Sequence, residues 1–174
     1  MGILTQSYQF PRDGGNLLID STIRVSADRG APLEFGESDD GGFGFRLGTG
    51  FCQEPGAELM NSDRLDDTDR LWGKPVCWVK HTATVVSKRA GVAMFGYPCN
   101  LRHPTGWPAR CYSLCSANPF AAGPFAKDKS KEGSYTISAG QTLELRYLVA
   151  IYDGELMRAT VDQVFARVAK EQSR

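Results

Sequence analysis

Short stretches in which apolar and polar residues alternate make up most of this chain, and glycine or proline separates them. In the segment 17–25, Leu17, Ile19, Ile23 and Val25 fall on alternate positions, which is the pattern of a strand with one face in a core. The 19 glycines and 9 prolines of the chain favour a protein built of strands. Further strands are predicted over 33–35, 43–47, 76–86, 90–97, 110–116, 135–138 and 142–152.

The end of the chain is the one segment with a helical pattern. Between Met157 and Val168, apolar residues recur at i, i+4, i+7, i+8 and i+11, so they share one face of a helix. The segments 54–69 and 121–133 predict surface connections. About nine or ten strands and one packing helix predict an all-β fold, a β-sandwich, in a single domain over residues 1–174.

Composition and charge restrict the classes of function. Hydrophobic residues make up 41% of the chain, which is enough for a core. The 20 basic and 20 acidic residues cancel, and no basic stripe is visible, which argues against nucleic-acid binding. No apolar run approaches the ~18 residues of a membrane helix, and the N-terminus shows no signal segment. We therefore expect a soluble, cytoplasmic protein.

The five cysteines leave two interpretations open. Their odd number disfavours a complete disulfide framework. Cys99, His103, Cys111 and Cys115 are the residue types of a zinc site, but their spacing matches no standard zinc motif, and unpaired thiols are common in cores. Core thiols are the favoured interpretation, so neither a metal nor another cofactor is expected.

The proline-rich stretch from Asn100 to Phe120 is the strongest candidate for a site. Prolines hold it in a rigid, non-helical path, and rigid loops that carry Arg, His, Trp and Asn commonly form sites. His103 is the first catalytic candidate, because Arg102 beside it favours a neutral imidazole that can act as a base. The alternative is a histidine that bonds a backbone carbonyl. Trp107 is either a platform for a sugar ring or a plug at one end of the sandwich.

Polar side chains in and near this stretch are the candidate binding residues. Arg46 stands between Gly44 and Gly48 on a strand face that glycine leaves open to a backbone or to a ligand. Guanidinium groups bind carboxylates and diols through paired N–H donors, although each arginine can instead pair with an acidic residue such as Asp39. The predicted binding set consists of Arg46, Asn100, Arg102, Trp107, Arg110 and Asn118.

Two further titratable residues lie outside that stretch. Lys74 is the second catalytic candidate, because Gly73 between Trp72 and Lys74 indicates a bend that aims the ammonium group. A buried lysine has a lowered pKa and can serve as acid or base, whereas an exposed lysine without a role is the more common case. His81 lies in a strand pattern and is expected on an exposed face.

A set of short motifs occurs in a fixed order along the chain, and the order resembles a known family. The motifs are Ser38–Arg46, Asn61-Ser62, Trp72-Gly73-Lys74, Asn100–Trp107 and Arg110–Phe120. In this order they resemble the soluble bacterial family called methane oxygenase PmoA, over residues 15 to 170. The strand from Gly140 to Tyr147 is similar as well.

This resemblance implies a β-sandwich in the style of the sugar mutarotases and a role connected with carbohydrates. Family chains are typically longer, so this chain resembles their C-terminal part, and the mutarotase-like supersandwich is then partial or completed by another chain. Two positions depart from the family. Pro108 replaces a histidine after Trp107, which weakens any His–His pair, and Asp39-Asp40-Gly41 replaces a turn that is usually Lys-Glu-Gly.

Two hypotheses on function follow, from different classes. In the first, the protein binds or acts on a saccharide in one hollow, where His103 and Lys74 handle protons, arginines hold polar groups and Trp107 stacks. In the second, a non-catalytic interaction module forms a homodimer through an exposed sheet edge. A third, a metal-dependent oxygenase, rests on the family name alone, and two histidines are too few for a histidine-rich metal site.

Overall fold

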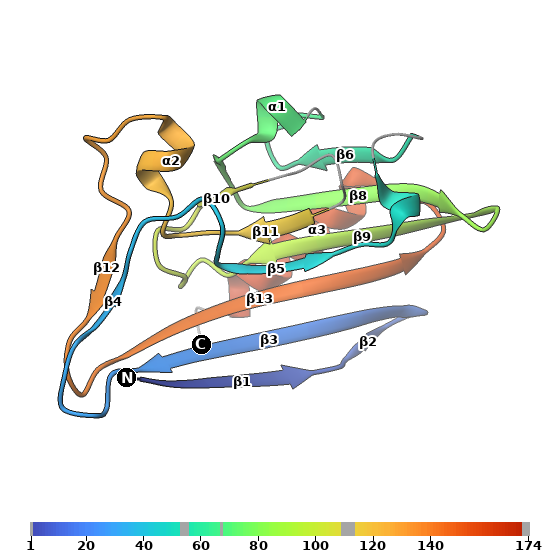
Figure 1. Ribbon diagram of the computed structural model, residues 1–174. Coiled ribbons are helices and arrows are strands. Elements are labelled where there is room, and N and C mark those ends of the chain that lie inside the picture. Colours follow the sequence, from blue (N-terminus) through green and yellow to red (C-terminus); the bar gives the residue numbers. More distant parts are fainter. Residues whose placement is uncertain (1, 53–55, 67, 109–113, 172–174) are drawn as a thin grey trace.

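One large antiparallel sheet is the frame of the computed structural model, which describes residues 2–52, 56–66, 68–108 and 114–171 (Figure 1). Within it, strands run in the order β1-β3-β13-β9-β8-β6, with β2 beside β3. The bounds are β1 (Ile3–Gln9), β2 (Arg12–Asp13), β3 (Asn16–Ser26), β6 (Glu58–Asn61), β8 (Trp78–Val85), β9 (Lys88–Gly96) and β13 (Thr142–Asp153).

The central strand β13 has two apolar faces because both faces of the sheet are covered. Leu145, Tyr147 and Val149 belong to the larger core, while Leu148 and Ala150 belong to the core on the other face. A strand buried on both sides is a nearly continuous apolar run, which is why this segment was visible in the sequence. It pairs with β3 on one side and with β9 on the other.

A second layer of three small antiparallel sheets covers one face of the large sheet (Figure 1). Each of these sheets joins two strands that are far apart in the chain, so the layer depends on long-range packing. The pairs are β4 (Leu33–Phe35) with β12 (Tyr135–Ile137), β5 (Phe43–Arg46) with β11 (Leu114–Ala117), and β7 (Lys74–Val76) with β10 (Thr105–Trp107).

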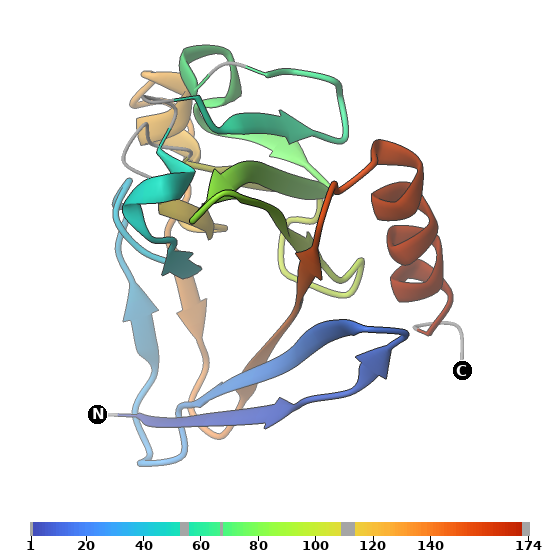
Figure 2. The same cartoon turned by 90° about the vertical axis from the view of Figure 1, so that its right-hand side faces the viewer.

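Helix α3 (Arg158–Glu171) covers the opposite face of the large sheet, as Figure 2 shows from the side. Val161, Val164 and Val168 are its buried residues, which are three of the positions that predicted this helix. The predicted fold class, a β-sandwich with a C-terminal helix, is therefore confirmed. The remaining helices are short and lie in connections: η1 (Thr49–Phe51), α1 (Thr68–Leu71) and α2 (Ala122–Ala126).

The prediction of two plain surface connections was wrong in part. Segment 54–69 contains β6, which pairs with β8 through backbone hydrogen bonds, and the first residues of α1. Segment 121–133 contains α2. The β6 residues Leu59 and Asn61 are buried, but a four-residue strand is too short for its alternation to stand out from the polar residues around it.

Candidate functional site

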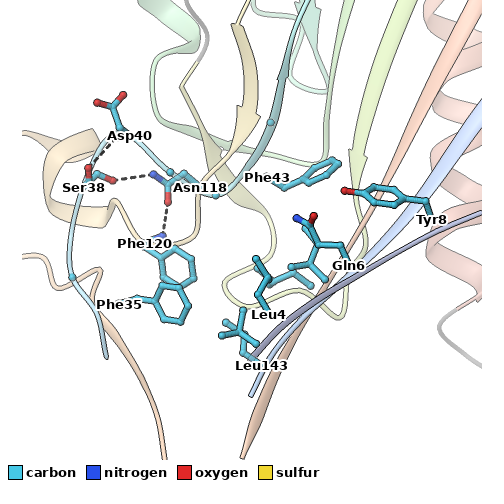
Figure 3. Close-up of a pocket in the computed structure, with 17 residues that line it drawn as sticks. Leu4, Gln6, Tyr8, Phe35, Ser38, Asp40, Phe43, Asn118, Phe120 and Leu143 are labelled. Atoms are coloured by element: carbon cyan, nitrogen blue, oxygen red, sulfur yellow. Dashed lines mark hydrogen bonds between the residues drawn. The ribbon is translucent and has the colours of Figure 1, made fainter. Parts of the chain in front are cut away.

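An apolar cleft opens between the large sheet and the second layer, with a volume of about 450 Å³ (Figure 3). On the second-layer side, the rings of Phe35 and Phe120 stack with centroids 4.6 Å apart. On the sheet side, β1 contributes Leu4, Gln6 and Tyr8, which fall on alternate positions and so project to the same face. The cleft is mostly apolar, and the edge strand forms one of its walls.

A second cavity, the cationic hollow, has a volume of about 360 Å³ and lies between β7, α2 and the loop after β9. We define it by five lining residues: Trp72, Lys74, Arg102, Phe125 and Lys131. None of its lining residues, all of which are in the described part of the chain, is acidic. The lining is therefore cationic, while Asp128 and Glu132 lie outside it and interact electrostatically with Lys131 and Arg102.

The floor of the cationic hollow is formed by an aromatic pair that packs on glycine. Trp72 and Phe125 meet edge to face, with ring centroids 5.7 Å apart and planes at 86°. A Cβ atom at Gly73 or Gly106 would overlap the Phe125 ring. Gly73 also has a φ of +66°, a conformation that glycine adopts most easily. The bend predicted at Gly73 is therefore real, and it seats an aromatic ring.

Arg102 lines the hollow, and its guanidinium donates hydrogen bonds to backbone carbonyl oxygens. Nη1 donates to the carbonyl oxygens of Pro119 at 2.7 Å and Gly133 at 2.5 Å, and Nη2 donates to that of Ser134 at 2.9 Å. Carbonyl oxygens fix the position of the guanidinium and satisfy three of its five N–H donors. These acceptors carry no full charge, and the carboxylate of Glu132, which is not a lining residue, is near enough to interact electrostatically with Arg102.

Asn118 separates the cationic hollow from the apolar cleft, since it lines both. It is buried, its Nδ2 donates to the carbonyl oxygen of Ser38 at 2.9 Å, and its Oδ1 accepts from the backbone N–H of Phe120 at 2.9 Å (Figure 3). These bonds connect the segment before β5, which contains Ser38, with the segment after β11, which contains Phe120. The side chain predicted to bind a ligand thus also holds the wall of the hollow.

Asn100, another predicted binding residue, is buried and bonded to backbone. Its Nδ2 donates to the carbonyl oxygen of Arg146 at 2.7 Å, and its Oδ1 accepts from the backbone N–H of the same residue at 2.6 Å. The pair of bonds ties the loop after β9 to β13. The geometry gives Asn100 a structural task, and its role in binding stays a prediction.

We expect Asn100→Ala to lower the free energy of unfolding by ~2 kcal/mol, because a buried N–H and a buried carbonyl lose their partner. Urea denaturation followed by circular dichroism measures this. Asn16→Ala, at a half-exposed position in β3, is the control and should change the free energy by less than ~0.5 kcal/mol. Equal effects for the two variants would contradict the structural task.

The remaining candidates that the structure describes do not share the hollow with Lys74, Arg102 and Asn118. Trp107 is 1% exposed and belongs to the core, where its Nε1 donates to the carbonyl oxygen of Val76 at 2.7 Å. Of its two interpretations, the plug fits, because a buried indole offers no face to a sugar. Arg46 is exposed and lines a different, smaller hollow beside Leu114. Arg110 lies outside the described residues.

His103 packs on the other side of the large sheet. Its ring stacks on Phe165 of α3 with centroids 6.3 Å apart, and burial lowers its pKa. His103 lines neither the apolar cleft nor the cationic hollow, so its imidazole shares no cavity with Lys74 and Arg102. The catalytic roles of His103 and Lys74 stay predictions, but the single hollow that was to unite His103, Trp107 and Arg46 does not form.

The glycines of the β5 segment make room for backbone, not for a ligand. A Cβ atom at Gly42 would overlap the carbonyl group of Ala117, and one at Gly44 would overlap Ser116. Both contacts are with β11, which pairs with β5. Of the two alternatives predicted for the strand face around Arg46, a backbone or a ligand, the first holds at Gly44, where the neighbouring strand approaches.

Two further properties of the described residues concern metal binding and membrane-spanning helices. No three His, Cys, Asp or Glu side chains among them are grouped closely enough to hold a metal ion. No helix in this part of the chain combines the length and apolar character needed to cross a membrane.

Comparison with known proteins gives one match. A family model, described as a family of unknown function (DUF6807), matches residues 5–166. No curated protein and no solved structure matches the chain. The resemblance to the methane oxygenase PmoA family was wrong, because no such family is matched. The oxygenase hypothesis rested on that family name and loses its support.

Proposed function

The chain belongs to this family of unknown function, and we propose, from the geometry of the cationic hollow, that it binds an acidic saccharide. The observation that carries the proposal is the gathering of three cationic side chains, Lys74, Arg102 and Lys131, beside an indole in a cavity without an acidic lining residue. The proposal keeps the saccharide hypothesis with Lys74 and Arg102, and it replaces His103 and Trp107 with Trp72 and Lys131.

The chemistry of a sugar acid matches the parts of this hollow. One face of a pyranose ring carries C–H groups, which pack on an amphipathic ring such as that of Trp72. A carboxylate on that sugar is attracted by Lys74 and Lys131, which are exposed and can adjust their position. The Arg102 guanidinium, fixed by carbonyls, adds charge at a constant position. About 360 Å³ is within the range of small-ligand pockets.

Binding is the activity that this hollow supports. Proton transfer by a side chain is most often the work of histidine or of a carboxylate, and the lining residues include neither, although Lys74 and Lys131 are present. We therefore propose recognition of the sugar acid without chemical change.

Titration of the intact protein with glucuronate, with glucose as the uncharged comparison, tests the proposal. Trp78 and Trp107 are each 1% exposed whereas Trp72 is half-buried in the hollow, so a change in tryptophan fluorescence reports occupancy of this site. We expect glucuronate to change the fluorescence at concentrations at which glucose does not. Added salt should weaken the binding, because it screens exposed charges.

Variants locate the binding within the molecule. Lys74→Ala and Lys131→Ala should each weaken glucuronate binding about twofold to fivefold, the effect of one exposed ion pair. Lys88→Ala, an exposed lysine in β9 outside the hollow, is the control and should bind as the original protein does. Equal binding of glucose and glucuronate, unchanged binding by both variants, or no binding of either sugar would each overturn the proposal.

A further inference from the structure

The edge strand β1 lacks the features that usually protect a sheet edge. All seven of its residues are exposed, and among the described residues it pairs on one side only, with β3. Its sequence Ile-Leu-Thr-Gln-Ser-Tyr-Gln contains neither a charged residue nor a proline. Natural sheets commonly block their edges with short strands, charges, prolines or bulges, because unpaired backbone groups add further strands readily.

The opposite edge of the same sheet shows such protection. Strand β6 has four residues, and its Glu58 forms an ion pair with Arg89 at 2.8 Å. A short edge with a charge on it is a poor template for another strand. The difference between the two edges points to β1 as the place where an additional strand binds.

The apolar residues of this edge are exposed on the side of the apolar cleft. Leu4 is 61% and Tyr8 46% exposed, although both line the cleft (Figure 3). Phe10, just after the strand, is 63% exposed. A partner strand beside β1 would cover these side chains and narrow the opening of the cleft.

We propose that the partner is a second copy of this chain, and that the two β1 strands pair antiparallel around a two-fold axis at Gln6. This register pairs all seven residues of β1, because Gln6 is the middle of Ile3–Gln9. Leu4 then lies opposite the partner's Tyr8, and Thr5 lies opposite the partner's Ser7. The two seven-stranded sheets become one continuous sheet.

The side chains of β1 are complementary to themselves in this register. Tyr8 opposite Leu4 is an aromatic–aliphatic cross-strand pair, a type that stabilises sheets. Gln6 lies opposite the partner's Gln6, and each carboxamide can donate a hydrogen bond to the other and accept one from it. Because β1 carries no charge, the self-pairing meets no like-charge repulsion.

Sedimentation of the protein over the micromolar range tests this interface with two paired variants. Thr5→Lys with Ser7→Lys sets lysine opposite lysine across the two-fold axis, and we expect a monomer. Thr5→Lys with Ser7→Glu sets lysine opposite glutamate, and we expect the dimer to be kept. Positions 5 and 7 alternate with the cleft-lining residues, so neither change alters the cleft.

A monomeric original protein would overturn the proposal, as would a dimer that persists with two lysines. If the lysine–glutamate variant is monomeric as well, the register around Gln6 is wrong. A second readout is amide hydrogen exchange in residues 3–9, which should slow as the protein concentration rises. None of the hollow's lining residues lies in β1, so glucuronate binding tests the proposed function separately.

Discussion

Replacement of Trp107 by alanine should lower the free energy of unfolding by ~3–5 kcal/mol, the usual effect of removing a large buried aromatic side chain. Trp107 is among the largest fully buried side chains in the described part of the chain and packs within the core between the large sheet and the second layer. The substitution loses the burial of the indole and leaves a cavity, because the surrounding strands relax only in part.

The hydrogen bond of the indole adds to this effect. Strand β10, which ends at Trp107, pairs with β7, and the indole Nε1 donates to the carbonyl oxygen of Val76 in that strand. The alanine variant leaves this buried acceptor without its donor, which costs about 1–3 kcal/mol where water cannot replace it. Trp107→Phe retains most of the packing, so it should show the smaller loss that belongs to the hydrogen bond.

Urea denaturation followed by circular dichroism measures these differences. Trp72→Ala is the matched control, because Trp72 is half-buried at the cationic hollow and contacts Phe125 at an edge. It should lower the free energy of unfolding by less than half as much. If Trp107→Ala were no more destabilising than Trp72→Ala, the indole would not be part of the core.

The elements that could be predicted are those whose pattern arises from local burial. Strand β3 was predicted over 17–25 and spans Asn16–Ser26, because alternate side chains enter the core. Helix α3 was predicted for the same reason, at a helical period. Strand β1 was missed, because all its residues are exposed and its side chains enter no core. Only pairing with β3 makes it a strand.

The sequence predicted several residues of the candidate site, but it did not predict which residues lie together in one hollow. Lys74, Arg102 and Asn118 were all proposed, and they line one hollow. Lys131 lies in the segment 121–133, which was predicted as a surface connection, since no local pattern shows that this segment lies beside β7. Trp107 had two interpretations with equal local support, and only long-range packing distinguishes a buried plug from an exposed platform.

His81 shows that the sequence also did not reveal whether a titratable side chain is buried. It was expected on an exposed face, but that prediction was wrong: it is 3% exposed in β8, opposite Leu59 and Val92 of the neighbouring strands. Burial lowers its pKa from 6.5 to about 4. Within the described residues its Nε2 has no hydrogen-bond partner, so the folded protein holds a neutral imidazole.

We therefore expect acid to unfold this protein partly through His81. The unfolded chain takes up a proton as the pH falls below 6.5, whereas the folded protein resists until about pH 4, so stability is full above 6.5 and falls between these values. The gap between the two pKa values corresponds to ~3 kcal/mol. The free energy of unfolding, measured by urea denaturation at several pH values across this window, should show the loss.

A His81→Leu variant separates this contribution from that of the carboxylates. Leucine fills a similar apolar space and takes up no proton, so the variant should lose ~3 kcal/mol less than the original protein between pH 6.5 and pH 4. His103→Gln is the control, because His103 is only half-buried and its pKa is lowered in the same direction. The free energy of unfolding of His103→Gln should still fall between pH 6.5 and pH 4 by most of the amount seen in the original protein. Parallel curves for the original protein and His81→Leu would mean that the imidazole is accessible to protons in the folded state.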